Sequence, residues 1–386
     1  MDIRRSKTEC NPSDVGYEES RLDTVNRFFE RMINDKIING VSYRLARRGK
    51  VFAAAALGSR HYTDSNLLME SDTIFRIASQ TKMFVSIAIQ MLVEDGLLSV
   101  EDKVAKYIPQ FDGAPYNEIS IFHLLTHTSG LYHEGIIEDK HHISSWEHIS
   151  RQNEIDGANT DWIAAALSAG MRRNPGEEWQ YSSIGYAILC AIVEKVTDTG
   201  SKEFIINRIC KPLGMNATTF DPSLEELRNG VIFDEESEDE IKDLASGNKR
   251  ENGVWDVMPG ASLFSNTNDL LRFGLMLSQW GRLDGVRILG RKTVETLSTQ
   301  RLFNVPNYCW GANDTDRKYG LGVDMRHIPG SLISPGTYFH EGAGHSVLIV
   351  DPVEEMVCSC VYPWVNNEWN ADCNNRLYNV MWSGVI

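Results

Sequence analysis

The sequence of 386 residues contains no apolar run as long as the ~18 residues that a membrane-spanning helix requires. Its longest apolar-rich stretch, Ile184 to Val193, is shorter and includes Tyr186 and Cys190, so we expect a helix buried in a protein core. The N-terminal residues MDIRRSKTECNPSD contain two arginines without an apolar segment behind them, unlike a secretory signal. We therefore expect a cytoplasmic protein that does not bind membranes.

Cysteine is scarce, and the seven residues are scattered, odd in number and without a Cys-x-x-Cys pair. This pattern fits reduced thiols better than a disulfide framework or a zinc knuckle. The segment His340-Glu-Gly-Ala-Gly-His345 has one residue too many for the zinc motif His-Glu-x-x-His, and its glycines oppose the helix that the motif requires. We expect no metal and no cofactor.

Positive charge is also in short supply, since the formal net charge is −15. Much of the negative charge lies in one acidic run from Phe233 to Asp243. Such a surface repels phosphate backbones, so we expect no nucleic-acid partner. The acidic run is interpreted as a solvated surface loop.

Hydrophobic patterning places strands near both ends of the chain and helices in the middle. Val41 to Ala46 and Val51 to Leu57 are expected to form a β-hairpin, because Arg47-Arg-Gly-Lys50 between them supplies a turn. Further expected elements are a helix over residues 17–36, helices from Ser79 to about residue 215, strands over 346–350 and 356–362, and a final helix over about 370–382.

This order predicts an α+β fold, in which an antiparallel sheet flanked by helices is built from both chain ends. We expect residues 1–78 and 261–386 to form this α/β domain, and residues 79–260 to form an inserted, mainly helical domain. The sequence contains no internal repeat and no low-complexity linker.

One short segment has the composition of a nucleophile with its base. Ser79 and Lys82 form Ser-x-x-Lys at the start of an apolar-periodic stretch, so a helix places both side chains on one face. A serine hydroxyl needs a neighbouring base, and a lysine becomes one only if burial or a positive potential lowers its pKa. The helix N-terminus also offers N–H groups to an oxyanion. Alone, the pattern is usually an N-cap followed by a solvated lysine.

Two later segments supply chemical partners. Tyr181-Ser-Ser183 follows a Pro-Gly turn and opens an apolar helix, so Tyr181 can carry a proton between nucleophile and leaving group. The alternative is a core aromatic residue. His340-Glu-Gly342-Ala-Gly344 leads into a strand, and its small residues let a substrate lie against the sheet edge, with the N–H of Ala343 as an oxyanion donor. The alternative is an ordinary glycine-rich turn.

The three segments resemble the Ser-x-x-Lys, Tyr-x-Asn and Lys/His-x-Gly motifs of the serine β-lactamase, penicillin-binding protein and esterase superfamily. The resemblance runs from about residue 20 to the end and implies a β-lactamase/transpeptidase-like fold. Flanking segments are similar to the branch that contains class C β-lactamases, D-peptidases and family VIII esterases. These segments are His123 to Leu131, Lys211 to Met215, Gly260 to Phe273, and Tyr319 to Gly322.

The resemblance implies an acylated nucleophile at Ser79, with Lys82 as its base and Tyr181 as the proton carrier. Which of the latter two takes the first proton is left open. His340 and Gly342 would shape the substrate site, and the N–H groups of Ser79 and Ala343 would bind the oxyanion. The resemblance also places Tyr132 near the cleft, although a plain surface aromatic is an equal alternative. The loops over 132–160 and 300–318 would set specificity, and Trp310, Trp364 and Trp369 are candidates for an aromatic pocket.

Two residues depart from the lactamase and peptidase pattern. Ser183 replaces the usual asparagine and cannot offer a carbonyl and an NH₂ together. Glu341 places a carboxylate in the third motif, where it would repel a substrate carboxylate unless it points away from the cleft. Both departures favour a serine hydrolase that cleaves a small-molecule ester or amide. The alternatives are an acyltransferase with the same acyl-enzyme, a β-lactamase or DD-peptidase, and a catalytically silent binding protein. The sequence defines neither the substrate nor the oligomeric state.

Overall fold

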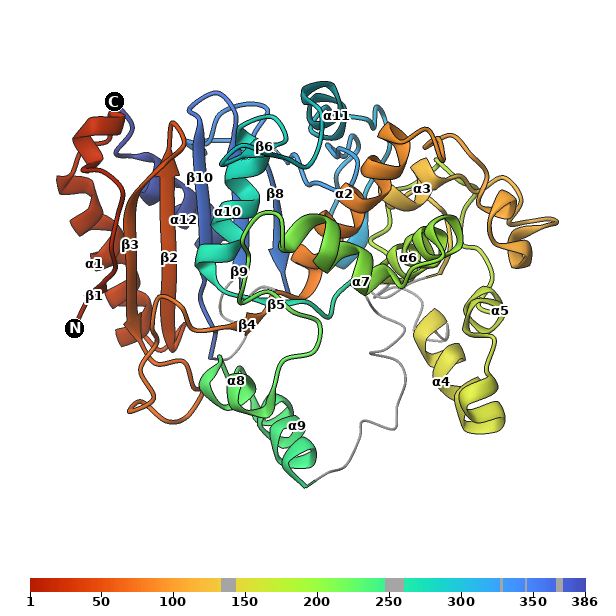
Figure 1. Cartoon of the computed structure of the whole chain (residues 1–386), viewed down its shortest axis with the longest axis horizontal. Coiled ribbons are helices and arrows are strands. Elements are labelled where there is room, and N and C mark those ends of the chain that lie inside the picture. Colours follow the sequence, from red (N-terminus) through yellow and green to blue (C-terminus); the bar gives the residue numbers. More distant parts are fainter. Residues whose placement is uncertain (133–143, 247–259, 327–328, 344–345, 366–370) are drawn as a thin grey trace.

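A six-stranded antiparallel sheet forms the centre of the computed structural model, which describes residues 1–132, 144–246, 260–326, 329–343, 346–365 and 371–386. The first half of the sheet comes from the N-terminal region and the second half from the C-terminal region (Figure 1). This arrangement confirms the predicted α+β fold. In spatial order the strands are β1 Arg4–Arg5, β3 Lys50–Gly58, β2 Gly40–Arg47, β10 Met356–Val361, β9 Ser346–Asp351 and β8 Tyr338–Gly342.

The predicted hairpin is the pair β2–β3. Arg47 pairs with Lys50, which leaves Arg48 and Gly49 as a two-residue turn. Both turn residues have positive φ, 51° and 76°, as the favoured two-residue hairpin turns require. At the centre of the sheet β2 also pairs with β10, and Ser42 lies opposite Val361. The first and last parts of the chain therefore share one sheet.

Helices cover both faces of the sheet (Figure 1). On one face, α1 (Ser20–Asn34) packs beside α12 (Ala371–Trp382), and Phe29, Tyr43 and Tyr378 lie in their shared core. On the other face lies α10 (Thr267–Ser278), a helix that the sequence analysis did not predict. Asn266 caps α10 by accepting a hydrogen bond from the Asp269 N–H at 2.9 Å.

The middle of the chain is mainly helical, as predicted, and α2 (Thr81–Glu94) runs through its core. Residues 81 to 92 of α2 are all buried, and Phe84 stacks on Phe273 of α10 with ring centroids 4.0 Å apart. Within the described chain, no helix is both long and apolar enough to cross a bilayer. The remaining helices are α3 Ile121–Leu125, α4 Ser145–Asp156, α5 Trp162–Leu167, α6 Ser183–Thr197, α7 Ser201–Ile205, α8 Leu224–Asn229, α9 Glu235–Ala245 and α11 Arg291–Leu297. The short strands are β4 Phe75–Arg76, β5 Phe264–Ser265, β6 Arg282–Leu283 and β7 Val286–Arg287.

The acidic run forms helix α9, so its prediction as a loop was wrong. Asp234 caps the helix by accepting a hydrogen bond from the Ser237 N–H at 2.8 Å, and three glutamates follow in the first turn. Negative charge is stabilising there, because the unpaired N–H groups carry partial positive charge. Glu240 pairs with Arg76 at 2.7 Å, and the Tyr62 hydroxyl donates to Glu238 at 2.7 Å.

Gly274 lets α10 approach the sheet. A Cβ at this position would lie 2.5 Å from Val357 Cγ1 and 3.0 Å from Leu348 Cδ1. We expect Gly274→Ala to lower the free energy of unfolding by ~1–3 kcal/mol, as overpacked cores do. Chemical denaturation measures the change. Gly185→Ala in α6 is the control, because a Cβ there meets its neighbours at 3.5 Å or more. Equal stability of both variants would contradict this account.

Candidate active site

The chain enters the site through a strained turn that is fixed to the sheet. The Ile77 N–H donates to Leu263 O at 2.9 Å, and Gln80 Nε2 donates to Ser346 Oγ at 2.6 Å. Between these contacts Ala78 has a φ of 45°, a conformation that non-glycine residues adopt rarely and at a cost. Ser79 follows in a single 3-10 turn (Ala78–Gln80), immediately before α2 begins at Thr81.

The three side chains predicted to be catalytic meet at one oxygen. Ser79 Oγ lies 3.1 Å from Lys82 Nζ and 2.5 Å from the Tyr181 hydroxyl. Lys82 follows one helical turn after Ser79, whereas Tyr181 comes from the loop before α6. The alternative of a solvated lysine is therefore wrong. Tyr181 is also half-buried against a small aromatic cluster, as its alternative as a core aromatic residue would have it, but its hydroxyl reaches Ser79. A serine oxygen between an amine and a phenol is an arrangement in which its proton can be removed.

Lys82 is completely buried, with 0% of its surface exposed. Its Nζ lies 3.5 Å from Gly260 O, 4.8 Å from the centroid of the Tyr181 ring and 5.7 Å from that of Tyr186. These neighbours are a carbonyl and two aromatic rings. Lys82 therefore has the burial that we expected of a lysine acting as a base.

His127 fixes the loop that carries Tyr181. Its Nδ1 accepts the Ser182 N–H at 3.0 Å, and its carbonyl accepts the Gln180 N–H at 2.7 Å. Its ring also lies 4.7 Å from the Tyr181 ring. From the sequence, His127 has no expected role beyond its place in the family-like segment His123 to Leu131. Membership of that segment was the one indication in the sequence that His127 matters. Its contacts with Tyr181 and Ser182 could not be predicted, because they join residues more than 50 positions apart.

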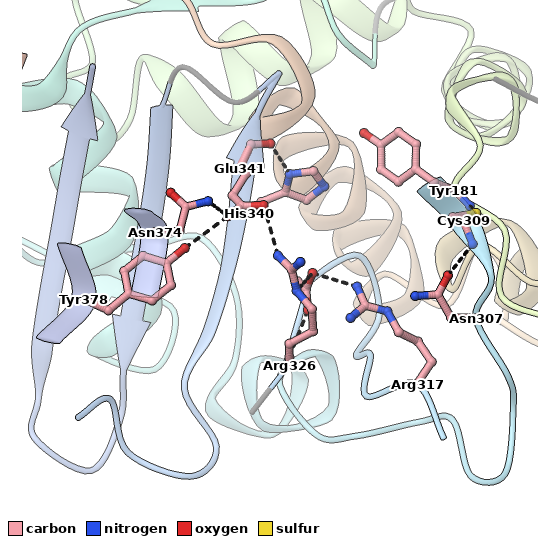
Figure 2. A network of polar contacts seen from close by, with 10 residues as sticks. Tyr181, Asn307, Cys309, Arg317, Arg326, His340, Glu341, Asn374 and Tyr378 are labelled. Atoms are coloured by element: carbon pink, nitrogen blue, oxygen red, sulfur yellow. Dashed lines mark hydrogen bonds and ion pairs between the residues drawn. The ribbon is translucent and has the colours of Figure 1, made fainter. Parts of the chain in front are cut away.

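A second set of contacts holds the same loop from the other side (Figure 2). The Tyr181 N–H donates to Cys309 Sγ at 3.4 Å, and the Cys309 N–H donates to Asn307 Oδ1 at 2.9 Å. The Trp179 N–H donates to Pro306 O at 2.8 Å. The segment around residues 306–309 is therefore tied to the Tyr181 loop by hydrogen bonds.

The third motif is itself a strand, the edge strand β8, and not only the glycine-rich turn expected from its sequence. Gly342 is required because a Cβ there would lie 2.3 Å from Ile77 O. β8 therefore ends against the turn that presents Ser79. Ala343 follows with a φ of 42° and is exposed. Its role as an oxyanion donor stays a prediction.

His340 is buried and uncharged at neutral pH. Burial, and then the positive charge of Lys82, lower the pKa of His340 to about 4. Nδ1 lies 2.7 Å from the backbone oxygen of Glu341. Because a carbonyl only accepts, Nδ1 carries the proton and Nε2 is an acceptor. Figure 2 shows the ring directed toward the side of the site where Tyr181 lies.

The Glu341 side chain points away from Ser79. The repulsion of a substrate carboxylate that the sequence suggested therefore does not arise. Its Oε2 pairs with Arg326 at 3.0 Å, and its Oε1 accepts hydrogen bonds from Asn374 at 2.8 Å and Tyr378 at 3.1 Å (Figure 2). The carboxylate is therefore engaged between β8 and α12. It does not repel a substrate carboxylate at the nucleophile.

A charged network continues from Glu341 behind the site (Figure 2). Asp324 Oδ2 lies 2.8 Å from Arg326 Nε and 2.7 Å from Arg317. Burial opposes a charge on Asp324, but the two guanidinium groups outweigh it and hold the pKa of this carboxyl below its usual range. Arg317 lies over the Trp179 ring at 4.3 Å. The network thus extends from β8 to the loop of Tyr181.

Several predicted residues lie at the margin of the described site. Ser183 is the first residue of α6 and is 7% exposed, while Ser182 is the residue that caps the helix. Tyr132 is half-buried, and its backbone oxygen accepts a hydrogen bond from Ser145 at 2.5 Å. The substrate-binding roles of Ser183 and Tyr132 stay predictions.

The candidate aromatic residues separate in the structure. Trp310 lies beside Tyr181, whereas Trp364 packs against the core between the sheet and the pair α1 and α12. Trp369 lies outside the described residues. The expected loop over 132–160 contains helix α4 from Ser145 to Asp156, so that part of the prediction was wrong. Residues 300–318 contain only one short 3-10 turn, Cys309–Gly311.

Comparisons with known proteins agree with this fold. The family model described as Beta-lactamase matches residues 25–363. A protein of Escherichia coli K12 named "Putative D-alanyl-D-alanine carboxypeptidase" is 26% identical, over 90% of this chain and 83% of its own length. A penicillin-binding protein homologue from Caulobacter crescentus matches with a TM-score of 0.74 and 19% identity, over 100% of both chains. A family VIII carboxylesterase matches with a TM-score of 0.73 and 18% identity, over 99% of this chain and 100% of its own.

The chain has the fold of the penicillin-binding protein homologue, and the match to the family model defines a serine hydrolase of the β-lactamase type. The chain belongs to the Beta-lactamase family.

The buried state of His340 gives a measurable titration. We expect His340 to stay neutral, as the Nδ1–H tautomer, until the pH falls to about 4, against about 6.5 for a free histidine. Because its pKa is lower in the folded protein, the unfolded chain takes up the proton first, and stability falls by ~3 kcal/mol between pH 6.5 and 4. Histidine NMR measures the titration and the tautomer. His340→Gln identifies the signal and should reduce the pH dependence of stability; the remaining dependence includes His123, whose pKa burial also lowers to about 4. A midpoint near 6.5 would contradict the assignment.

Asp324 carries the central charge of the network, and we expect its removal to lower the free energy of unfolding strongly. Asp324→Asn leaves the buried guanidinium of Arg317 without its carboxylate and the half-buried Arg326 with Glu341 alone. We therefore expect a loss of ~3–5 kcal/mol in unfolding free energy at pH 7. Below pH 4 the difference from wild type should shrink, because protonation of Asp324 through its lowered pKa removes the same charge. Urea titration of both proteins measures this. The control is Glu295→Gln, whose exposed ion pairs are worth ~0–1 kcal/mol. A similar small loss in both variants would count against the network.

Proposed function

We propose that this protein hydrolyses small, uncharged esters through an acyl-enzyme on Ser79. The observation that carries the proposal is the position of Ser79 Oγ, within hydrogen-bonding distance of both Lys82 and Tyr181. Chemistry at this oxygen needs a proton acceptor beside the hydroxyl and a proton donor for the leaving group, and the two neighbours supply both.

The reaction has two halves. In acylation the Ser79 proton passes to the Lys82 and Tyr181 pair, and Oγ attacks the ester carbonyl to form a tetrahedral oxyanion. The N–H groups of Ser79 and Ala343 would stabilise this oxyanion. As the carbon–oxygen bond breaks, Tyr181 gives its proton to the leaving alcohol. In deacylation a water molecule loses a proton to the same pair and attacks the acyl carbon, and the proton returns to Ser79.

The charges around the site favour an uncharged substrate. The third-motif position holds a neutral His340, so a substrate carboxylate gains no full positive charge from it. Arg317 and Arg326 behind the site are each paired with a carboxylate. Ser183 also lacks the amide that would bind the acylamino group of a β-lactam or peptide. Glu341 does not contribute to the preference for an uncharged substrate, because its carboxylate points away from Ser79.

We also propose that the protein acts in a reducing compartment such as the cytoplasm. All seven cysteines lie in the described part of the chain, and no disulfide joins any of them. Cys190, Cys358 and Cys360 are fully buried, and burial raises the pKa of each thiol. Thiols persist where glutathione and thioredoxin keep them reduced.

Active-site labelling tests the proposal. We expect a fluorophosphonate probe to modify Ser79 stoichiometrically and Ser79→Ala to lower ester turnover by at least ~10³-fold. Tyr181→Phe removes the proton donor and should cost ~10²–10⁴-fold. Ser86→Ala, a buried serine later on the same helix, is the control and should retain the label. Intact mass and peptide mapping identify the modified residue.

The substrate panel separates the alternatives. It contains p-nitrophenyl esters, D-aminoacyl amides and a chromogenic cephalosporin, with and without added alcohols and amines. We expect turnover of the esters to free acid. Transfer of the acyl group to the added acceptor would indicate an acyltransferase. Full activity of Ser79→Ala without labelling at Ser79 would overturn the proposal.

A further inference from the structure

A large aromatic side chain is exposed beside the proton-carrying tyrosine. Trp310 is 56% exposed, although tryptophan gains much from burial. Its ring centroid lies 5.2 Å from that of Tyr181, at an interplanar angle of 49°. It also lies 6.5 Å from Trp179, which is only 2% exposed. Trp310 therefore contacts Tyr181 while it leaves over half of its surface open to a ligand.

The backbone holds Trp310 in a rare conformation. Its φ and ψ are 54° and 33°, in the left-handed region that bulky residues seldom adopt. Such strain persists only where the surrounding structure fixes it, and it is concentrated at functional sites. The next residue is Gly311, with a φ of 79°, so the chain turns sharply at the point where it presents the ring.

The surrounding contacts fix the segment that carries Trp310. Asn307 and Asp314 exchange backbone hydrogen bonds of 2.8 and 3.1 Å and close the segment at its base. Cys309, the residue before Trp310, accepts the Tyr181 N–H and receives support from Asn307 (Figure 2). The indole is thus positioned against Tyr181 before any substrate arrives. A preformed contact of this kind binds a ligand without the cost of ordering a loop.

We propose that Trp310 is a specificity-determining wall for the leaving alcohol, and that the preferred substrates are esters of aromatic alcohols. This inference rests on the proposed function. The hydroxyl of Tyr181 must lie beside the leaving oxygen to protonate it, so the group attached to that oxygen extends along the Tyr181 side of the site, where Trp310 stands. If the Ala343 N–H binds the oxyanion as proposed, the carbonyl oxygen of the substrate lies toward the end of β8 and not toward Trp310. An aromatic ring packed on the indole contributes ~0.5–1.5 kcal/mol beyond its buried area.

Pairs of esters with matched reactivity test the inference. Benzyl acetate and ethyl acetate share an acyl group and release alcohols of similar acidity, so the ratio of their kcat/KM values reports contacts of the alcohol part. We expect Trp310→Ala to lower this ratio by about 2- to 12-fold, the equivalent of one aromatic pair. Trp310→Phe should recover most of it. Ethyl phenylacetate, which carries the ring in the acyl part, should keep its ratio to ethyl acetate.

Trp280→Ala is the matched control. Trp280 is 41% exposed and has a φ of 58°, but it lies after the end of α10 and away from Tyr181. We expect this variant to keep the wild-type ratios. An unchanged benzyl ratio in Trp310→Ala would overturn the inference. A loss confined to ethyl phenylacetate would also overturn it, because Trp310 would then contact the acyl part.

A labelling assay separates this inference from the proposed function. Benzyl alcohol should slow fluorophosphonate labelling of Ser79 in the wild type, and more weakly in Trp310→Ala. This readout requires no turnover. Absence of labelling in the wild type would refute the acyl-enzyme itself. Normal labelling with equal protection in both proteins would refute only the role of Trp310.

Discussion

The burial of Lys82 is the constraint on which the site depends. Burial of a charged ammonium group costs free energy. A lysine can therefore remain in a protein core only if nearby groups stabilise its charge or if the amine loses its proton. In this protein the amine lies between Ser79 Oγ, one carbonyl and two aromatic rings. The same positive charge helps to keep His340 neutral, although burial has the larger effect. The position of one amine therefore affects both the nucleophile and the protonation of the third motif.

The site joins two supports that are distant in the sequence. The turn of Ser79 is fixed to the sheet through Ile77, Gln80 and Gly342. The loop of Tyr181 is held by His127 on one side and by Cys309 on the other. The network of Glu341, Arg326, Asp324 and Arg317 connects the two supports behind the cleft. We therefore expect a change at Asp324 to act on both the third motif and the surroundings of Tyr181.

The sequence predicted the sheet, the hairpin and the meeting of Ser79, Lys82 and Tyr181, because these features depend on local periodicity and on motifs of fixed order. Its proposed domain boundaries stay a prediction. Helix α10 and strand β8 were not predicted from the sequence. Helix α9 was predicted as a loop, because composition alone does not distinguish a capped acidic helix from an acidic loop. The direction of the Glu341 side chain could not be predicted either. In a strand, neighbouring side chains point to opposite faces, so the assignment of β8 as a strand was needed first.

The pairing of β2 with β10 has a consequence for how the protein is made. Ser42 finds its partner in Val361, so strands that are synthesised early wait for nearly the whole chain before the sheet closes. Until then β2 presents an unpaired edge, and such edges template association with other chains. Contacts of this sequence separation also slow folding, because loop closure precedes any gain from them. The β2 edge of the N-terminal hairpin therefore stays open to such association until β10 has been synthesised and paired with it.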